Sequence, residues 1–136
     1  MFSPGWGWYL GQYERGQIRD KRFANQVKDY SGLLYGKITP TDIDGFLDFG
    51  NKVFVFLEVK YGDTTMATGQ RLALERLSDA CQEAGKQTLV VVASHESEGD
   101  IDVANLPVTM VRFHKRWLKR QGTVREVIDT FLDWVS

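Results

Sequence analysis

A continuous apolar run over residues 88–94, TLVVVAS, follows a segment with helical periodicity over residues 69–84. A short, β-branched run of this kind is typical of a strand that is buried on both faces of a sheet. The preceding segment ends at Gly85, and its apolar side chains form one expected helix face: Leu72, Leu74, Leu77, Ala80, Cys81 and Ala84. We therefore predict an α/β fold in which helices flank a central mixed sheet.

Shorter patterns predict the other elements. Gly50 and Asn51 form a turn signal between two extended segments, which predicts a β-hairpin. Thr123 is expected to cap the last helix. In chain order we expect a helix over 14–31, strands over 41–49 and 52–60, a helix over 69–84, strands over 88–94 and 108–113, and a helix over 123–135. The predicted order is α-β-β-α-β-β-α.

The composition is that of one ordinary globular domain. A chain of 136 residues suits a single core, so we expect one domain over 1–136. The net charge of -1 at pH 7 excludes a basic field over the whole surface, so a nucleic acid would need a local patch. One cysteine and two histidines argue against a disulfide framework and a zinc site. The sequence has neither a membrane-length apolar run nor a secretory signal pattern, which predicts a cytoplasmic protein with no membrane partner.

The segment 52–60 carries charge at its end. Its side chains alternate between two faces, so Glu58 and Lys60 share the face of two phenylalanines. Asp44 lies in the preceding strand and joins them if the hairpin has a loop longer than two residues or a bulge. One interpretation is a solvated surface charge pair. The other is a site made of an aspartate, a glutamate and a lysine at one edge of the sheet.

Such a site has a definite chemistry. Two close carboxylates repel each other unless a cation lies between them. Oxygen ligands with open positions suit Mg²⁺ or Mn²⁺, which also bind phosphate oxygens. The ion would polarise a scissile phosphate and promote formation of hydroxide from bound water. Lys60 would orient or deprotonate the attacking water, or neutralise charge in the transition state.

The spacing Asp44 … Glu58-Val59-Lys60, on a hairpin followed by a helix, resembles the PD-(D/E)XK nuclease superfamily. The resemblance implies a restriction-endonuclease-like core over about 14–93, with a C-terminal strand and helix over 107–135. It also implies that Asp44, Glu58 and the Val59 carbonyl bind the metal while Lys60 assists hydrolysis. The proline-aspartate pair of the family is not intact, because Pro40 is followed by Thr41. Asp42 therefore stays an alternative metal ligand, on the same side of the strand as Asp44.

Two further residues follow from the resemblance. Gln70 opens the helix after the motif, as a glutamine does in the Holliday-junction-resolvase-like and viral replication-repair-type branch. This implies that Gln70 positions the lysine or contacts phosphate; the alternative is an ordinary polar residue at a helix start. Glu14 corresponds to an extra metal ligand of some members, although a solvated charge at the start of the predicted first helix is the simpler interpretation.

Two clusters of basic residues are candidates for nucleic-acid binding. They comprise Arg112, Lys115, Arg116, Lys119, Arg120 and Arg125 in the C-terminal third, and Arg15, Arg19 and Arg22 on one face of the first predicted helix. The alternative is that these side chains are simply solvated. No base-reading motif accompanies them, which favours recognition of nucleic-acid shape or backbone.

Together these features predict a small Mg²⁺-dependent deoxyribonuclease that hydrolyses phosphodiester bonds with metal-activated water. The resemblance implies 5′-phosphate and 3′-hydroxyl products, and compact phage-encoded recombination or repair nucleases are similar, which would place the protein in a bacterial host. The small size predicts structure-selective cutting of branched or nicked DNA, as a homodimer or as a subunit of a larger complex. A catalytically silent module of this fold that binds DNA or a protein partner is the main alternative. A charged α/β scaffold without a nucleic-acid role is a third.

Overall fold

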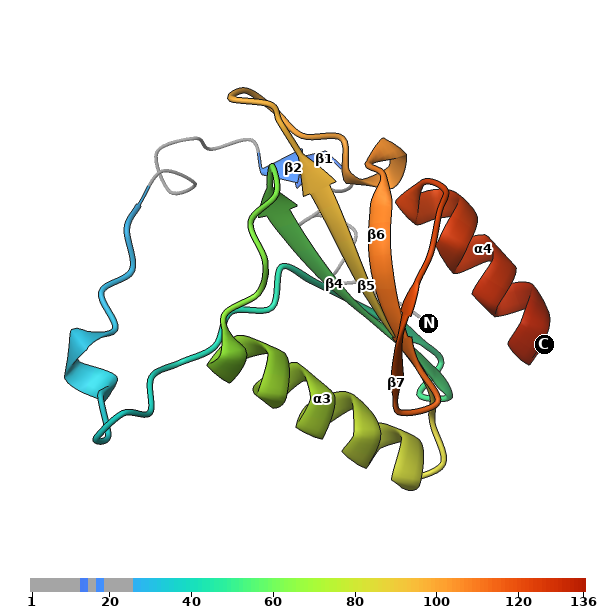
Figure 1. Cartoon of the computed structure of the whole chain (residues 1–136), viewed down its shortest axis with the longest axis horizontal. Helices are drawn as coiled ribbons and strands as arrows, with labels where there is room; N and C mark the ends of the chain where they lie inside the picture. Colours follow the sequence, from blue (N-terminus) through green and yellow to red (C-terminus); the bar gives the residue numbers. More distant parts are fainter. Residues whose placement is uncertain (1–12, 15–16, 19–25) are drawn as a thin grey trace. The chain divides into compact units, whose positions relative to one another are not determined.

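The computed structural model describes residues 13–14, 17–18 and 26–136 (Figure 1). The chain forms two compact units, Met1–Pro40 and Thr41–Ser136. In the first unit, β1 (Tyr13–Glu14) pairs antiparallel with β2 (Gln17–Ile18), and a short 3-10 helix, η1, spans Ser31–Leu33. Across all residues that the structure describes, no helix is long and apolar enough to cross a membrane.

The predicted helix over 14–31 is wrong for the residues that are described. These residues form the two short strands, an irregular segment and the start of η1. The apolar positions in this range are irregularly spaced, and Gly16 lowers helix propensity within it. Glu14 lies in β1 rather than at a helix start. The predicted basic face of this helix, Arg15, Arg19 and Arg22, lies outside the described residues.

The second unit contains a mixed sheet with the strand order β3-β4-β5-β6-β7. The strands are β3 (Gly45–Phe49), β4 (Val53–Tyr61), β5 (Gln87–His95), β6 (Val108–Phe113) and β7 (Arg116–Lys119). The central pair, β4 and β5, is parallel, and every other neighbouring pair is antiparallel. The helix α3 (Thr68–Glu83) connects the two parallel strands, as a crossover between parallel strands requires.

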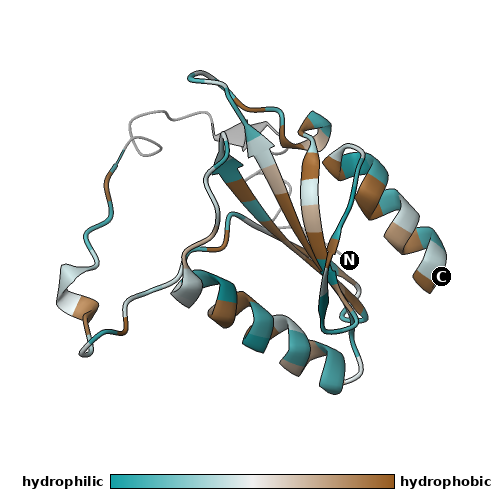
Figure 2. Ribbon diagram, viewed as in Figure 1, coloured by the Kyte–Doolittle hydropathy of each residue, from teal (hydrophilic) through white to brown (hydrophobic). Residues whose placement is uncertain are grey.

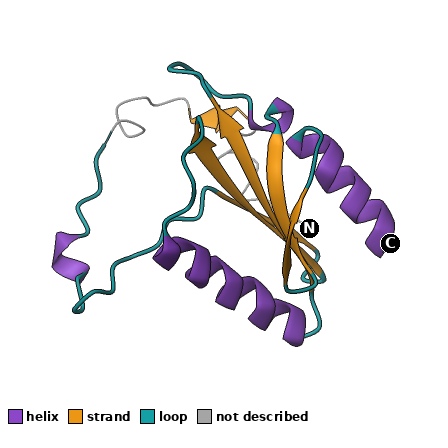
Figure 3. Ribbon diagram, viewed as in Figure 1, coloured by secondary structure: helices purple, strands orange, loops and turns teal. Residues whose placement is uncertain are grey.

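The sheet lies between α3 and α4 (Val124–Val135), one helix on each face (Figures 1 and 3). On the α3 face, Phe56, Leu74 and Val90 form a small core. On the opposite face, β4, β5 and β6 pack against α4, whose buried side chains are Val124, Val127, Ile128 and Phe131. The central strands themselves contain many hydrophobic residues (Figure 2). Both faces of β5 are buried, so the α/β prediction with a flanked mixed sheet is confirmed.

The predicted cap of the last helix is also present. The Thr123 hydroxyl accepts a hydrogen bond from the Glu126 N–H at 3.1 Å, and the Glu126 carboxylate accepts one from the Thr123 N–H at 2.9 Å. This reciprocal pair satisfies two N–H groups that the helix itself leaves unpaired. The helix α4 therefore begins directly after the predicted cap residue, Thr123.

The strand β7 was not predicted. Its sequence, RWLK, has two basic residues, and the turn before it lacks the usual glycine or asparagine. His114 and Lys115 instead adopt positive φ angles of 48° and 65°. Pairing with β6 across this turn forms a strand from a segment whose charge indicates a loop.

Candidate active site

The loop between β3 and β4 determines which side chains meet. Phe49 pairs with Val53, so three residues form the loop, and two of them, Gly50 and Asn51, have positive φ angles of 66° and 63°. The ladder ends at the pair Gly45 and Leu57. This three-residue loop is longer than two residues, as a shared face of Asp44 and Glu58 requires. One further step of the register would set Asp44 opposite Glu58, although Asp44 itself lies before the ladder.

Asp44 lies directly before β3 and contacts the backbone of β4. The Val59 N–H donates a hydrogen bond to Asp44 Oδ2 at 2.7 Å. Asp42, two positions earlier, is exposed and lies outside the strand. Of the two aspartates considered from the sequence, Asp44 is thus the one that the structure brings to the Glu58-Val59-Lys60 segment.

Glu58 is buried, with 2% of the residue exposed. Its Oε1 accepts a hydrogen bond from Gln70 Nε2 at 2.8 Å and lies 3.1 Å from Lys60 Nζ. Its Oε2 is also buried and has no hydrogen-bond partner among the described residues. Burial is the main cause that raises the pKa of Glu58, and the charge of Asp44 adds to it, whereas Lys60 and Gln70 act in the opposite direction.

Gln70 connects the acid to the amine. It lies in the first turn of α3, and its Oε1 accepts a hydrogen bond from Lys60 Nζ at 2.7 Å while its Nε2 donates to Glu58. The opposite amide orientation would face a donor with a donor and an acceptor with an acceptor. The side chain therefore holds Glu58 and Lys60 side by side.

The candidate metal ligands are few. Within the described residues, no three histidine, cysteine, aspartate or glutamate side chains come together. A divalent ion at this site would therefore have two carboxylates, those of Asp44 and Glu58, with the Val59 carbonyl as a further oxygen. The unpartnered Glu58 Oε2 fits such an ion, because a buried carboxylate oxygen without a hydrogen bond is costly and a cation relieves that cost.

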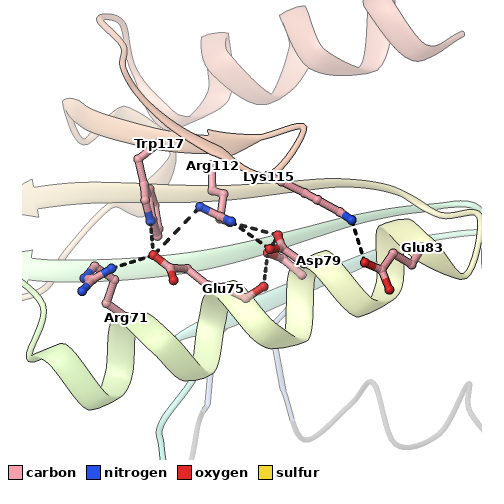
Figure 4. A network of polar contacts seen from close by, with 8 residues as sticks. Arg71, Glu75, Asp79, Glu83, Arg112, Lys115 and Trp117 are labelled. Carbon is pink, nitrogen blue, oxygen red and sulfur yellow. Dashed lines mark hydrogen bonds and ion pairs between the residues drawn. The ribbon is translucent and has the colours of Figure 1, made fainter.

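The predicted C-terminal basic cluster divides into paired and unpaired side chains. Arg112, 10% exposed in its side chain, donates to both oxygens of Asp79 at 3.0 and 2.8 Å (Figure 4). Lys115 pairs with Glu83 at 2.6 Å. Figure 4 shows how both pairs join α3 to β6 and the following turn. Both pairs connect α3 to the sheet, but only the Arg112–Asp79 pair is largely buried, since Lys115 and Glu83 are exposed.

A second part of this network was not predicted. Glu75 Oε1 accepts hydrogen bonds from Trp117 Nε1 at 2.6 Å and from Arg71 Nη1 at 2.7 Å (Figure 4). Trp117 and Arg71 lower the pKa of Glu75, with the indole N–H as the largest cause. The sequence signal was the acidic row Glu75, Asp79 and Glu83, which recurs every four residues and thus faces one side of a helix.

The other predicted basic residues are free of these pairs. Arg116, Lys119 and Arg120 are exposed and form no ion pair with another described residue. Arg125 pairs with Asp129 on the exposed side of α4. A positive surface that reaches solvent therefore lies at β7 and just after it.

A cavity of about 350 Å³ adjoins the candidate site. Lys60 forms part of its wall, and the loop before α3, the ends of β5 and β6, and Lys119 form the rest. The cavity thus lies between the catalytic candidates and the free positive charge on β7.

Comparison with known proteins adds no identification. No protein-family model, no curated protein and no solved structure matches this chain.

Proposed function

We propose that this protein is a divalent-metal-dependent nuclease that hydrolyses phosphodiester bonds in DNA, with a restriction-endonuclease-like core of the PD-(D/E)XK type. The observation that carries the proposal is a buried glutamate that a glutamine holds beside a lysine, with one carboxylate oxygen that has no hydrogen-bond partner among the described residues. A solvated surface charge pair would not explain the burial of Glu58 or the bridge that Gln70 forms between Glu58 and Lys60. Exposed ion pairs contribute little to stability and do not require such support.

Mg²⁺ or Mn²⁺ is the proposed cofactor, held by Asp44, Glu58 and the Val59 carbonyl. When bound, it would act as a Lewis acid toward the scissile phosphate. In support, the hydrogen bond from the Val59 N–H holds Asp44 beside the end of β4, the strand that carries Glu58.

Lys60 and Gln70 have separate roles in this proposal. An ammonium group has three N–H donors, and Lys60 donates one of them to Gln70 Oε1, while its Nζ lies 3.1 Å from Glu58 Oε1 in an ion pair. A remaining N–H can donate to a phosphate oxygen or to the attacking water, where the positive charge stabilises the developing negative charge. Gln70 contacts both side chains and fixes their separation, so it orients the site.

The substrate proposed is branched or nicked DNA, cut during recombination or repair, by a homodimer or by a subunit of a larger complex. Arg116, Lys119 and Arg120, which form no ion pair with another described residue, can contact the phosphate backbone. A catalytically silent module that binds DNA is the second candidate. The limited set of two carboxylates favours this alternative, because a weakly held ion gives little catalysis.

The test compares cleavage of branched, nicked and linear DNA in Mg²⁺, in Mn²⁺ and in chelator. We expect cutting only with metal, and a loss of about 100-fold or more in Glu58→Ala and Lys60→Ala. Asp44→Asn should lose activity to the same degree, whereas Asp42→Asn is the matched control and should retain it.

Each other outcome has a clear meaning. Tight DNA binding without cutting in either metal would contradict the nuclease and support the silent module. Cutting that survives in Glu58→Ala would contradict the site. Loss in Asp42→Asn with retention in Asp44→Asn would assign the metal to the other aspartate.

A further inference from the structure

We propose that the cavity beside Lys60 is a subsite for one unpaired DNA nucleotide next to the scissile phosphate, and that Lys119 contacts the phosphate of this nucleotide. This inference rests on the proposed function and adds a substrate class, namely DNA with a single-stranded segment at the cutting position.

The position of the cavity suits a ligand. It lies at the ends of the parallel strands β4 and β5, next to the loop over residues 62–66 that leads into α3. Ligands of open α/β sheets bind at the carboxyl ends of parallel strands. Lys60 belongs both to the candidate site and to the cavity wall, so the two are continuous.

The sheet register supports the same inference. Glu58 pairs with Val92, Val92 with Met110, and Met110 with Lys119. Directly paired residues of neighbouring strands project on the same face, so Glu58 and Lys119 lie on one face with two apolar residues between them. A β-bulge after Val92 also brings Thr109 into the cavity wall.

The lining suits a nucleotide. Val92, Met66 and Met110 offer an apolar surface to a base, while Lys60 and Lys119 offer positive charge to a phosphate. The one acidic residue in the wall, Asp63, opposes an anion, but the two lysines outnumber it. A volume of about 350 Å³ is near the lower limit of ligand pockets, so one nucleotide fits and a stacked base pair stays outside.

The two lysines differ in their partners. Lys60 is held by Glu58 and Gln70, whereas Lys119 is exposed and forms no ion pair with any residue that the structure describes. The Lys119 ammonium at the far wall of the cavity is therefore the group that can respond to a phosphate. Lys119 is in this view a specificity-determining residue and not part of the metal site.

The experiment measures binding of a short single-stranded oligonucleotide and of a blunt duplex of the same sequence, in chelator, so that nothing is cut. We expect Lys119→Ala to weaken single-strand binding about fivefold to tenfold and to reduce the salt slope of that binding by about 0.7. Blunt-duplex binding should change less than about twofold, and Lys119→Arg should restore single-strand binding. Lys52→Ala is the matched control, because Lys52 is exposed at the opposite end of β4; it should leave both affinities unchanged.

Cleavage in Mg²⁺, measured on the same variants, separates this inference from the proposed function. If Lys119→Ala weakens binding of single strand and duplex equally, or weakens neither more than Lys52→Ala does, the subsite is overturned even if the protein cuts DNA. Single-strand binding that depends on Lys119 in a protein that cuts nothing would support the subsite and overturn the nuclease. Circular dichroism of each variant checks that the fold is intact.

Discussion

Glu58 is a carboxylate whose two oxygens have different surroundings. One oxygen contacts Gln70 and Lys60, and the other is buried without a partner among the described residues. Leaving a charged oxygen in this state destabilises the folded protein, because water no longer solvates it. The sequence pattern identified Glu58 as a candidate, but its burial comes from α3, which covers this face of the sheet.

The substitution Glu58→Gln should stabilise the protein in chelator at neutral pH, by about 1 kcal/mol, because it removes a buried charge whose Oε2 has no hydrogen-bond partner among the described residues, while it keeps the shape of the side chain. In Mg²⁺ the wild-type protein should gain thermal stability through binding, and Glu58→Gln should not. Thermal unfolding with and without Mg²⁺ measures both effects.

Glu98→Gln is the control for this experiment, since Glu98 is exposed in a loop and should affect neither quantity. If Glu58→Gln lowers the unfolding temperature in chelator, the Glu58 charge stabilises the fold through Lys60 by more than the buried Oε2 destabilises it.

At the scale of elements, α3 is attached to the sheet in two ways. One is the small core around Leu74, and the other is the polar network that joins its acidic row to β6 and β7. Leu77, predicted to be in the buried face, is 41% exposed, and the polar residue Ser78 is buried instead. The buried side of the helix therefore differs from the predicted one, and Glu75 and Asp79 lie on the side that contacts Arg112 and Trp117.

The ion pair of Asp79 with Arg112 should make the free energy of unfolding depend on pH in the acid range. Arg112 holds the pKa of Asp79 below its ordinary value, mainly through its hydrogen bonds. Because the folded-state pKa is the lower one, the pair stabilises the fold fully above the unfolded-state pKa of about 4, and this stability is lost as the pH falls through the folded-state pKa. Arg112→Met should therefore reduce the free energy of unfolding at pH 7 by about 2 kcal/mol and reduce its loss in acid.

Urea unfolding at pH 7 and pH 3 measures this prediction. Arg125→Met is the matched control, because the Arg125–Asp129 pair is exposed on α4 and screened by solvent, so its loss should cost only about 0.4 kcal/mol. Equal effects of the two substitutions at pH 7 would show that the pair between α3 and β6 does not stabilise the fold.

At the scale of the whole molecule, the sheet, α3 and α4 all belong to the unit Thr41–Ser136. Both hydrophobic clusters consist of side chains from this unit. The candidate site and the proposed subsite lie within it as well.

A fragment comprising residues 41–136 should therefore fold by itself. We expect a cooperative urea transition and a far-ultraviolet circular dichroism spectrum with helix and strand content, because the fragment retains every buried residue of both clusters. A non-cooperative transition would show that the sheet depends on the first forty residues.

The sequence by itself determined the β4–α3–β5 succession, the cap of α4 and the candidate residues on β4, because these depend on local periodicity, propensity and capping. The sequence did not predict contacts between side chains that are far apart along the chain. Arg112 and Asp79 are 33 residues apart, and Trp117 and Glu75 are 42 apart, so no local pattern shows that these partners meet. Only the tertiary structure decided which basic side chains hold the fold together, which remain free, and how Gln70 joins Glu58 to Lys60, because these contacts form only after α3 packs on the sheet.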